Sequence, residues 1–164
     1  MGQYGKERHE NPDNVKSQAG HVILLNNCPI IWSSKLQQQI CLSTMMAEYY
    51  ALSAAMKEVL PLLEVAKAVA RGLGVNDLLL TDFKTTIWED NMGALTLAQL
   101  DPGQHTIHSK LYDVCVHWFR SIVHAPNSGM TVAKIDTKDQ LADLFTKPLP
   151  EPTFRHLRAK LMGW

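Results

Sequence analysis

The chain has 164 residues, enough for one domain with a buried core, and 46% of them are hydrophobic, which excludes a disordered chain. Lys plus Arg and Asp plus Glu number 16 each, so the zero net charge does not indicate nucleic-acid binding, although a local basic patch would be compatible with it. Three widely spaced cysteines argue against a disulfide framework, and the polar N-terminus is no secretory signal. We expect one intracellular domain over residues 1–164 that does not engage membranes.

The first elements read as a loop followed by a β-hairpin. Residues 1–20 are polar and rich in turn-forming residues. The short apolar runs 21–25 and 29–33 predict two strands, and Asn26-Asn27 between them is typical of a hairpin turn.

A long helix follows. Residues 43–70 carry apolar side chains at spacings of three and four, and Ser43 or Thr44 can cap the start. Pro61 should kink or divide this helix, and the glycines just beyond it should end it.

The C-terminal half alternates strands and helices. A capping box, residues 137–140, predicts a helix that ends before Pro148. The other predicted elements are a strand (85–90), two helices (91–100 and 112–124), a strand (130–135) and a terminal helix (151–164). The order β-β-α-β-α-α-β-α-α predicts a mixed α/β domain.

Glu48 stands against the apolar stripe of the long helix. A capping box would need an acid three residues after Ser43 or Thr44, and those positions hold Met46 and Ala47. Glu48 lies roughly 60° from the centre of the stripe, which is its edge. It is either a boundary acid paired with a cation or a functional carboxylate.

Other acids leave similar alternatives. Asp90 ends a predicted strand, where α/β domains gather ligands, but Asp90-Asn91 could simply cap the next helix. Asp143 points away from the apolar side chains around it, which predicts a solvated surface acid, and Asp136 and Asp139 read as loop or cap acids. Carboxylates that converge repel one another unless a cation lies between them. Oxygen ligands favour Mg²⁺ or Mn²⁺, and two such ions can cleave a phosphodiester.

Several ordered blocks resemble the ribonuclease H domain of copia-type LTR retrotransposon polyproteins. The chain reads "EDNMGAL", "SKLYDVCVHWFR" and "TKDQLADLFTKPLP" where that family has its D-N-x-x-A, K-H…H-[FW]-[FIV]-R and D-x-L-A-D-[IL]-F-T-K-P-L blocks. Its first block, K-S-x-x-G…W-x-S-K-x-Q…L-S-T-x-E-A-E-Y-x-A-L, is matched by Lys16, Ser17, Gly20, Trp32, Ser34, Lys35, Gln37, Leu42, Ser43, Thr44, Ala47, Glu48, Tyr49, Ala51 and Leu52.

The resemblance implies a ribonuclease H-like fold, a five-stranded mixed sheet flanked by helices. It implies two-metal cleavage, with Mg²⁺ or Mn²⁺, of the RNA strand of an RNA–DNA hybrid during reverse transcription. The family's catalytic, metal-binding acids carry over onto Glu48, Asp90 and Asp143. Implied partners are the hybrid and the reverse transcriptase domain of a parent polyprotein, in cytoplasmic virus-like particles or the nucleus.

The chain also departs from the family pattern. The family's first acid lies in a D-x-D-[FWY]-A-G strand, and this chain begins where that motif ends. We therefore expect an N-terminally truncated domain without its first, central strand, whose two neighbours lose a ladder partner. Met46 stands for a usual Glu, and His108 and Leu111 stand for the usual Arg and His around Lys110.

Two functions follow from the sequence. One is a hybrid-specific ribonuclease, with Lys35, Lys110 and Arg120 as candidate contacts to the nucleic-acid backbone. For each of these cations, a solvated surface charge is the competing interpretation. The other function is a catalytically inactive remnant of a retroelement that binds nucleic acid weakly at most.

Overall fold

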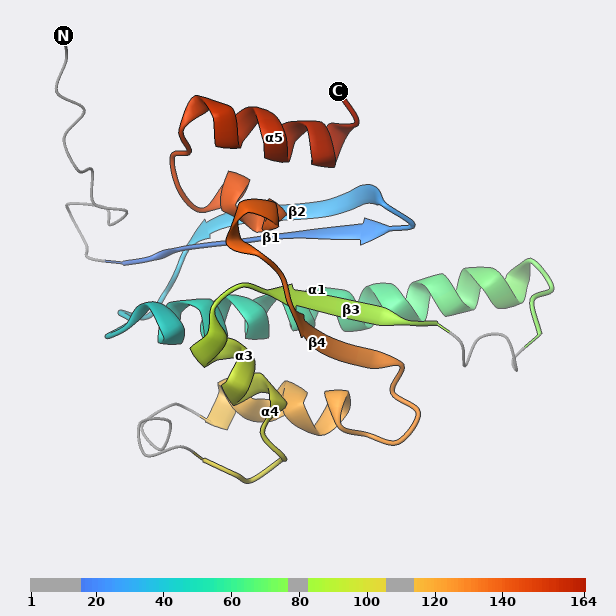
Figure 1. Cartoon of the computed structure of the whole chain (residues 1–164). Helices are drawn as coiled ribbons and strands as arrows, with labels where there is room; N and C mark the ends of the chain where they lie inside the picture. Colours follow the sequence, from blue (N-terminus) through green and yellow to red (C-terminus); the bar gives the residue numbers. More distant parts are fainter. Residues whose placement is uncertain (1–15, 77–82, 106–113) are drawn as a thin grey trace, which may run out of the picture. The chain divides into compact units, whose positions relative to one another are not determined.

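The computed structural model describes residues 16–76, 83–105 and 114–164, which form two compact units (Figure 1). One unit comprises Met1–Ala47 with Lys138–Trp164, and the other comprises Glu48–Thr137. Within the described ranges, no helix combines the length and the apolar character needed to cross a membrane.

The first unit is built on the predicted β-hairpin. Strand β1 (Gln18–Leu25) pairs antiparallel with β2 (Cys28–Leu36). Asn26 and Asn27 have φ values of 50° and 63°, the left-handed conformation that a two-residue type I′ turn requires. The hairpin prediction is confirmed, and both strands are longer than predicted because the ladder continues beyond the apolar runs as far as the pair of Gln18 and Leu36.

The predicted helix after Thr137 is wrong. The chain forms two short 3-10 helices, η2 (Thr137–Asp139) and η3 (Leu141–Phe145), and the Gln140 side chain accepts a hydrogen bond from the Ala142 N–H at 3.5 Å. The carbonyl of Phe145 accepts a hydrogen bond from Ser34 Oγ at 2.6 Å, so it is used for docking on β2 rather than for a longer helix. Helix α5 (Glu151–Met162) then packs against η3 and β2 (Figure 1).

Gly20 lets η3 approach β1 closely. A Cβ at this position would lie 2.7 Å from Thr146 Cγ2 and 2.8 Å from Phe145 Cβ, which real Cβ atoms do not tolerate. Gly20 and Ser34 both belong to the first sequence block, and both hold the end of η3 against the hairpin. They therefore position the segment that carries Asp143.

Gly20→Ala is expected to lower the free energy of unfolding by about 2 kcal/mol, because the added methyl must push η3 off β1. Gly72→Ala is the matched control, since a Cβ at Gly72 has no heavy atom within 4 Å and the residue ends a helix. Urea unfolding of both variants measures the difference. Equal midpoints would show that η3 does not depend on this close approach.

Helix α1 (Thr44–Gly72) is a single helix whose buried side chains belong to the second unit. Ser43 Oγ accepts a hydrogen bond from the Met46 N–H at 3.1 Å, which confirms Ser43 as the cap. Of the two effects predicted for Pro61, a kink or a division of the helix, the division is wrong, because the helix continues through it. Pro61 is exposed, so water can reach the Lys57 carbonyl that loses its helical donor.

The second unit also contains a parallel strand pair. Strand β3 (Thr85–Glu89) pairs with β4 (Met130–Lys134), and helices α3 (Met92–Gln99) and α4 (Val114–Val123) pack on it. The Gln99 side chain donates to the Val132 carbonyl at 3.0 Å, which fastens α3 to β4. The Tyr49 and Phe119 rings, with centroids 5.4 Å apart, join α1 to α4 in a fully buried core.

The predicted mixed α/β class is confirmed at this level. The described residues contain four strands in two two-stranded sheets, β1-β2 and β3-β4, instead of one continuous sheet. This arrangement is compatible with a ribonuclease H-like fold.

Candidate active site

Asp90 directly follows β3, at the carboxyl end of the parallel strand pair. Asn91 caps α3, because its Oδ1 accepts hydrogen bonds from the Gly93 and Ala94 N–H groups at 2.9 and 3.1 Å. The sequence left open whether Asp90 serves as a cap, and the structure gives that role to Asn91. The carboxylate of Asp90 is therefore available for a ligand.

A cavity of about 430 Å³ opens at this end of the strands. Asp90 lines it from β3, and the segment that leaves β4 supplies Lys134, Ile135, Asp136 and Thr137. All of these residues belong to the second unit. A cavity at the carboxyl ends of parallel strands is the usual position of a ligand site in α/β domains.

Glu89 is a feature of the site that sequence reasoning missed. It is only 5% exposed, and burial raises the pKa of its carboxyl from 4.5 to about 7. The charges of Glu48 and Asp90 raise this pKa further, while the hydrogen bond from the Asn91 N–H to Glu89 Oε1 lowers it. The alternation of side chains along β3 could have predicted that Glu89 faces inward, because it puts Glu89 on the same side of the strand as Ile87.

Glu48 lies at the edge of the buried stripe of α1, as the helical spacing predicted, and is half-buried. The next residue, Tyr49, is fully buried and its hydroxyl lies 3.0 Å from His117 Nδ1, which fixes this turn of α1 against α4. Because the charges of Glu48 and Asp90 both act on Glu89, the second unit brings these two predicted site acids toward the same strand end.

Glu89→Gln is expected to stabilise the chain at pH 8 by about 2 kcal/mol. The rise in pKa from 4.5 to about 7 corresponds to a penalty of about 3 kcal/mol once Glu89 ionises, and glutamine avoids it while keeping the shape. Between pH 4.5 and 7 the folded wild-type chain binds more protons than the unfolded one, so its stability falls as pH rises.

Urea unfolding in EDTA across pH 4 to 8 measures this effect, with EDTA keeping metal ions out of the comparison. The variant should show a flatter profile than the wild type over this range. A wild-type profile that is already flat would contradict the burial of an ionisable Glu89.

Asp143 lies in the first unit, on η3. The prediction of a solvated surface acid is wrong, because Asp143 is 9% exposed and its Oδ2 is 2.8 Å from Lys147 Nζ. The 3-10 backbone changes which side chains face inward, and the helical wheel used for the prediction does not apply to it. Asp143 is thus a buried, paired carboxylate.

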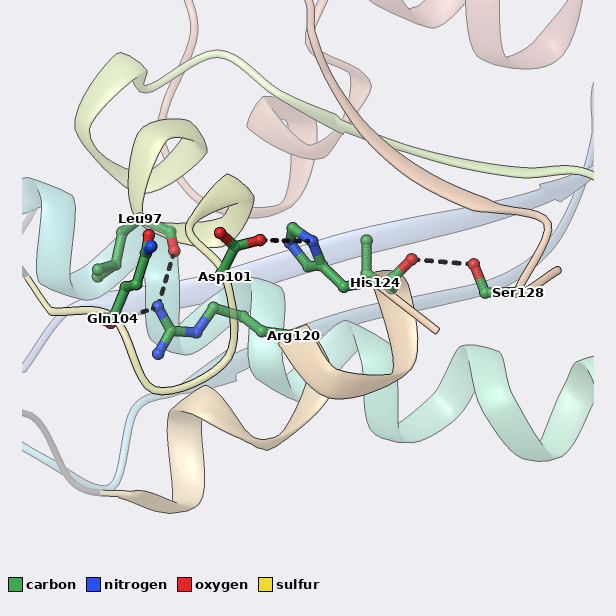
Figure 2. Close-up of polar contacts among 7 residues, drawn as sticks. Leu97, Asp101, Gln104, Arg120, His124 and Ser128 are labelled. Carbon is green, nitrogen blue, oxygen red and sulfur yellow. Dashed lines mark hydrogen bonds and ion pairs between the residues drawn. The ribbon is translucent and has the colours of Figure 1, made fainter. Parts of the chain in front are cut away.

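The three predicted backbone contacts have different surroundings. Lys35 is exposed on β2, and Lys110 lies outside the described residues. Arg120 is 1% exposed, and its guanidinium donates to the carbonyls of Leu97 and Gln104 at 3.4 and 3.0 Å (Figure 2). A nucleic-acid phosphate could reach Arg120 only if this corner opened, so the structure gives Arg120 a role in packing.

The site's donor chemistry fits a hard divalent cation. Glu48 and Asp90 offer carboxylate oxygens, the ligands that Mg²⁺ and Mn²⁺ prefer. The charges of both raise the pKa of Glu89 in the same unit. Across the described parts of the chain, no group of three or more His, Cys, Asp or Glu side chains is close enough to form a complete metal site. The second unit thus brings the charges of Glu48 and Asp90 close to Glu89, but its described residues hold no complete group of metal ligands.

The fold and these acids define a mixed α/β protein with carboxylates at the ends of parallel strands. The chain is similar to segments of retrotransposon Pol polyproteins. It is 31% identical over 151 residues to the retrovirus-related Pol polyprotein from transposon TNT 1-94 of Nicotiana tabacum, with 92% of this chain and 10% of the relative covered.

Two further relatives come from other hosts. Identity is 28% over 151 residues to the Pol polyprotein from transposon RE2 of Arabidopsis thaliana, covering 91% of this chain and 9% of the relative. The chain is 30% identical over 153 residues to the transposon Ty1-DR5 Gag-Pol polyprotein of Saccharomyces cerevisiae, an alignment that covers 92% of this chain and 8% of the relative. The chain thus spans about a tenth of the curated relatives, and these similarities support a retroelement-derived protein. No protein-family model and no solved structure matches the chain.

Proposed function

We propose that the chain is a ribonuclease H-like domain that cleaves the RNA strand of an RNA–DNA hybrid. The observation that carries the proposal is the position of Asp90, which ends a parallel strand, lines a cavity and is not used to cap α3. The similarity to retrotransposon Pol polyproteins supports it, because reverse transcription of a retroelement produces such hybrids.

In this proposal Glu48, Asp90 and Asp143 hold Mg²⁺ or Mn²⁺, which would activate a water molecule and stabilise the leaving oxygen. Asp90 presents its carboxylate from a turn that Asn91 and the buried Glu89 keep in place. Glu48 approaches from a helix turn anchored by Tyr49. Lys35 and Lys110 are the cations we propose to follow the phosphates of the hybrid, and a polymerase domain of a longer polyprotein is the proposed partner.

The test uses the whole chain with a labelled RNA–DNA hybrid in Mg²⁺ or Mn²⁺. We expect RNA fragments from the hybrid, none from an RNA duplex of the same sequence, and none in EDTA. The duplex is the matched control, because it keeps the RNA strand and removes only the DNA partner. Circular dichroism of the same sample establishes that the chain is folded.

A folded chain that leaves the hybrid intact in both metals would overturn the proposal. That outcome would support the second candidate, an inactive retroelement remnant. The observation that favours this candidate is the lack of a complete three-ligand group among the described residues.

A further inference from the structure

Lys134 is an exposed cation at the site that the sequence analysis did not single out. It is the last residue of β4 and stands opposite Glu89 in the parallel register. None of the ion pairs found within the described ranges involves Lys134. Its ammonium group thus has no carboxylate partner among those residues, although it lines the same cavity as Asp90.

The cavity combines donors with acids. Lys134 supplies an ammonium group and Thr137 a hydroxyl, while Asp90 and Asp136 supply carboxylates. The backbone that follows Lys134 is held in place, because the Ile135 N–H donates to the Glu89 carbonyl at 3.1 Å. This hydrogen bond continues the β3–β4 ladder by one residue. Lys134 is therefore presented from a fixed strand end and not from a free loop.

We propose that Lys134 contacts a phosphate of the nucleic-acid backbone in this cavity, beside Asp90, with Thr137 as a second donor. The inference rests on the proposed function and adds a contact residue to it. A phosphodiester is the anion that both a carboxylate-bound divalent cation and a lysine can hold at once. The 430 Å³ cavity lies within the size range of small-ligand sites, so a sugar-phosphate unit can enter it.

A competing role for Lys134 is to neutralise the carboxylates around it. In that role, its loss would change the stability of the chain and leave nucleic-acid binding unaffected. In the proposed role, its loss would remove one phosphate contact and leave stability unaffected. The two roles therefore differ in which measurement responds.

The experiment measures binding of a short fluorescent RNA–DNA hybrid to the full chain across a range of salt concentrations, in Ca²⁺ to limit cleavage. For Lys134→Gln we expect several-fold weaker binding and a salt slope smaller by about 0.9, the value for one phosphate contact. Lys134→Arg should restore both. The matched control is Lys84→Gln, which removes an exposed lysine near the opposite end of the same strand pair and should leave the slope unchanged.

Asp136→Asn provides a second test of opposite sign, because removing an acid from a phosphate site should tighten binding. Equal slopes for Lys134→Gln and Lys84→Gln would overturn the inference, as would a loss of thermal stability in Lys134→Gln without a change in slope. If the wild-type chain binds no hybrid, the proposed function itself fails. Binding that persists in every variant rejects only the contact by Lys134.

Discussion

Asp90→Asn is expected to reduce metal-dependent cleavage of an RNA–DNA hybrid at least about a hundredfold. Asparagine keeps the shape of the side chain but removes the negative charge that would hold a divalent cation at the end of β3. Because Asn91 caps α3, the substitution should leave the fold intact. Initial rates of RNA cleavage in saturating Mg²⁺, with the unfolding midpoint of the same sample, give both quantities.

Asp101→Asn is the matched control. Asp101 belongs to the same unit, its side chain is 70% exposed, and its Oδ1 lies 3.7 Å from His124 Nδ1 (Figure 2). It is not among the residues that line the strand-end cavity. We expect a change in rate of less than about twofold, because an exposed pair of this kind contributes little. Similar losses in Asp90→Asn and Asp101→Asn would show that cleavage does not depend on the strand-end carboxylate.

Arg120→Ala is expected to lower the free energy of unfolding by about 3 kcal/mol. The guanidinium is buried and bonds to the carbonyls of Leu97 and Gln104, so it ties α4 to the end of α3 and to the loop after it (Figure 2). Alanine leaves these acceptors unsatisfied and opens a cavity. Arg120→Lys should have a stability between those of the wild type and Arg120→Ala, because an ammonium group can still donate to these carbonyls but does not fill the space of the buried guanidinium.

Arg155→Ala controls for the loss of an arginine in itself. Its side chain is 70% exposed and pairs with Glu151 on the surface of α5, so we expect a cost below about 0.5 kcal/mol. Urea midpoints at pH 7 compare the variants. A similar midpoint for both alanine variants would contradict a packing role for Arg120. If Arg120→Ala kept its stability but bound the hybrid more weakly, Arg120 would again be a candidate contact to the nucleic-acid backbone.

Local sequence signals predicted most of the secondary structure. The Asn26-Asn27 turn, the stripe of α1 and the strand before Asp90 each depend on neighbours in sequence, so turn chemistry and periodicity were sufficient for them. The segment around Asp143 was mispredicted because its backbone is shaped by β1 and β2, through Gly20 and Ser34, which lie more than a hundred residues away.

The candidate site was predicted only in part. Glu48 and Asp90 could be named from position and resemblance, and their charges act on one buried carboxyl in the structure. The burial of Glu89 and of Arg120 could not be foreseen, because burial depends on which elements pack together. Arg120 was therefore interpreted as a surface cation.

The sequence by itself determined most of the order of the elements and the mixed α/β class, because caps, turns and side-chain periodicity act over a few residues. The candidate acids came from its resemblance to a known family. Only the tertiary structure decided that Asn91 and not Asp90 caps α3, that Asp143 is buried beside Lys147, and that Lys134 lines a cavity with Asp90. The burial of Asp143 and the cavity shared by Lys134 and Asp90 depend on contacts between separate elements, where the surroundings set the state of each side chain. The Asn91 cap is a local contact, but the sequence offered two neighbouring residues for it and only the structure chose between them.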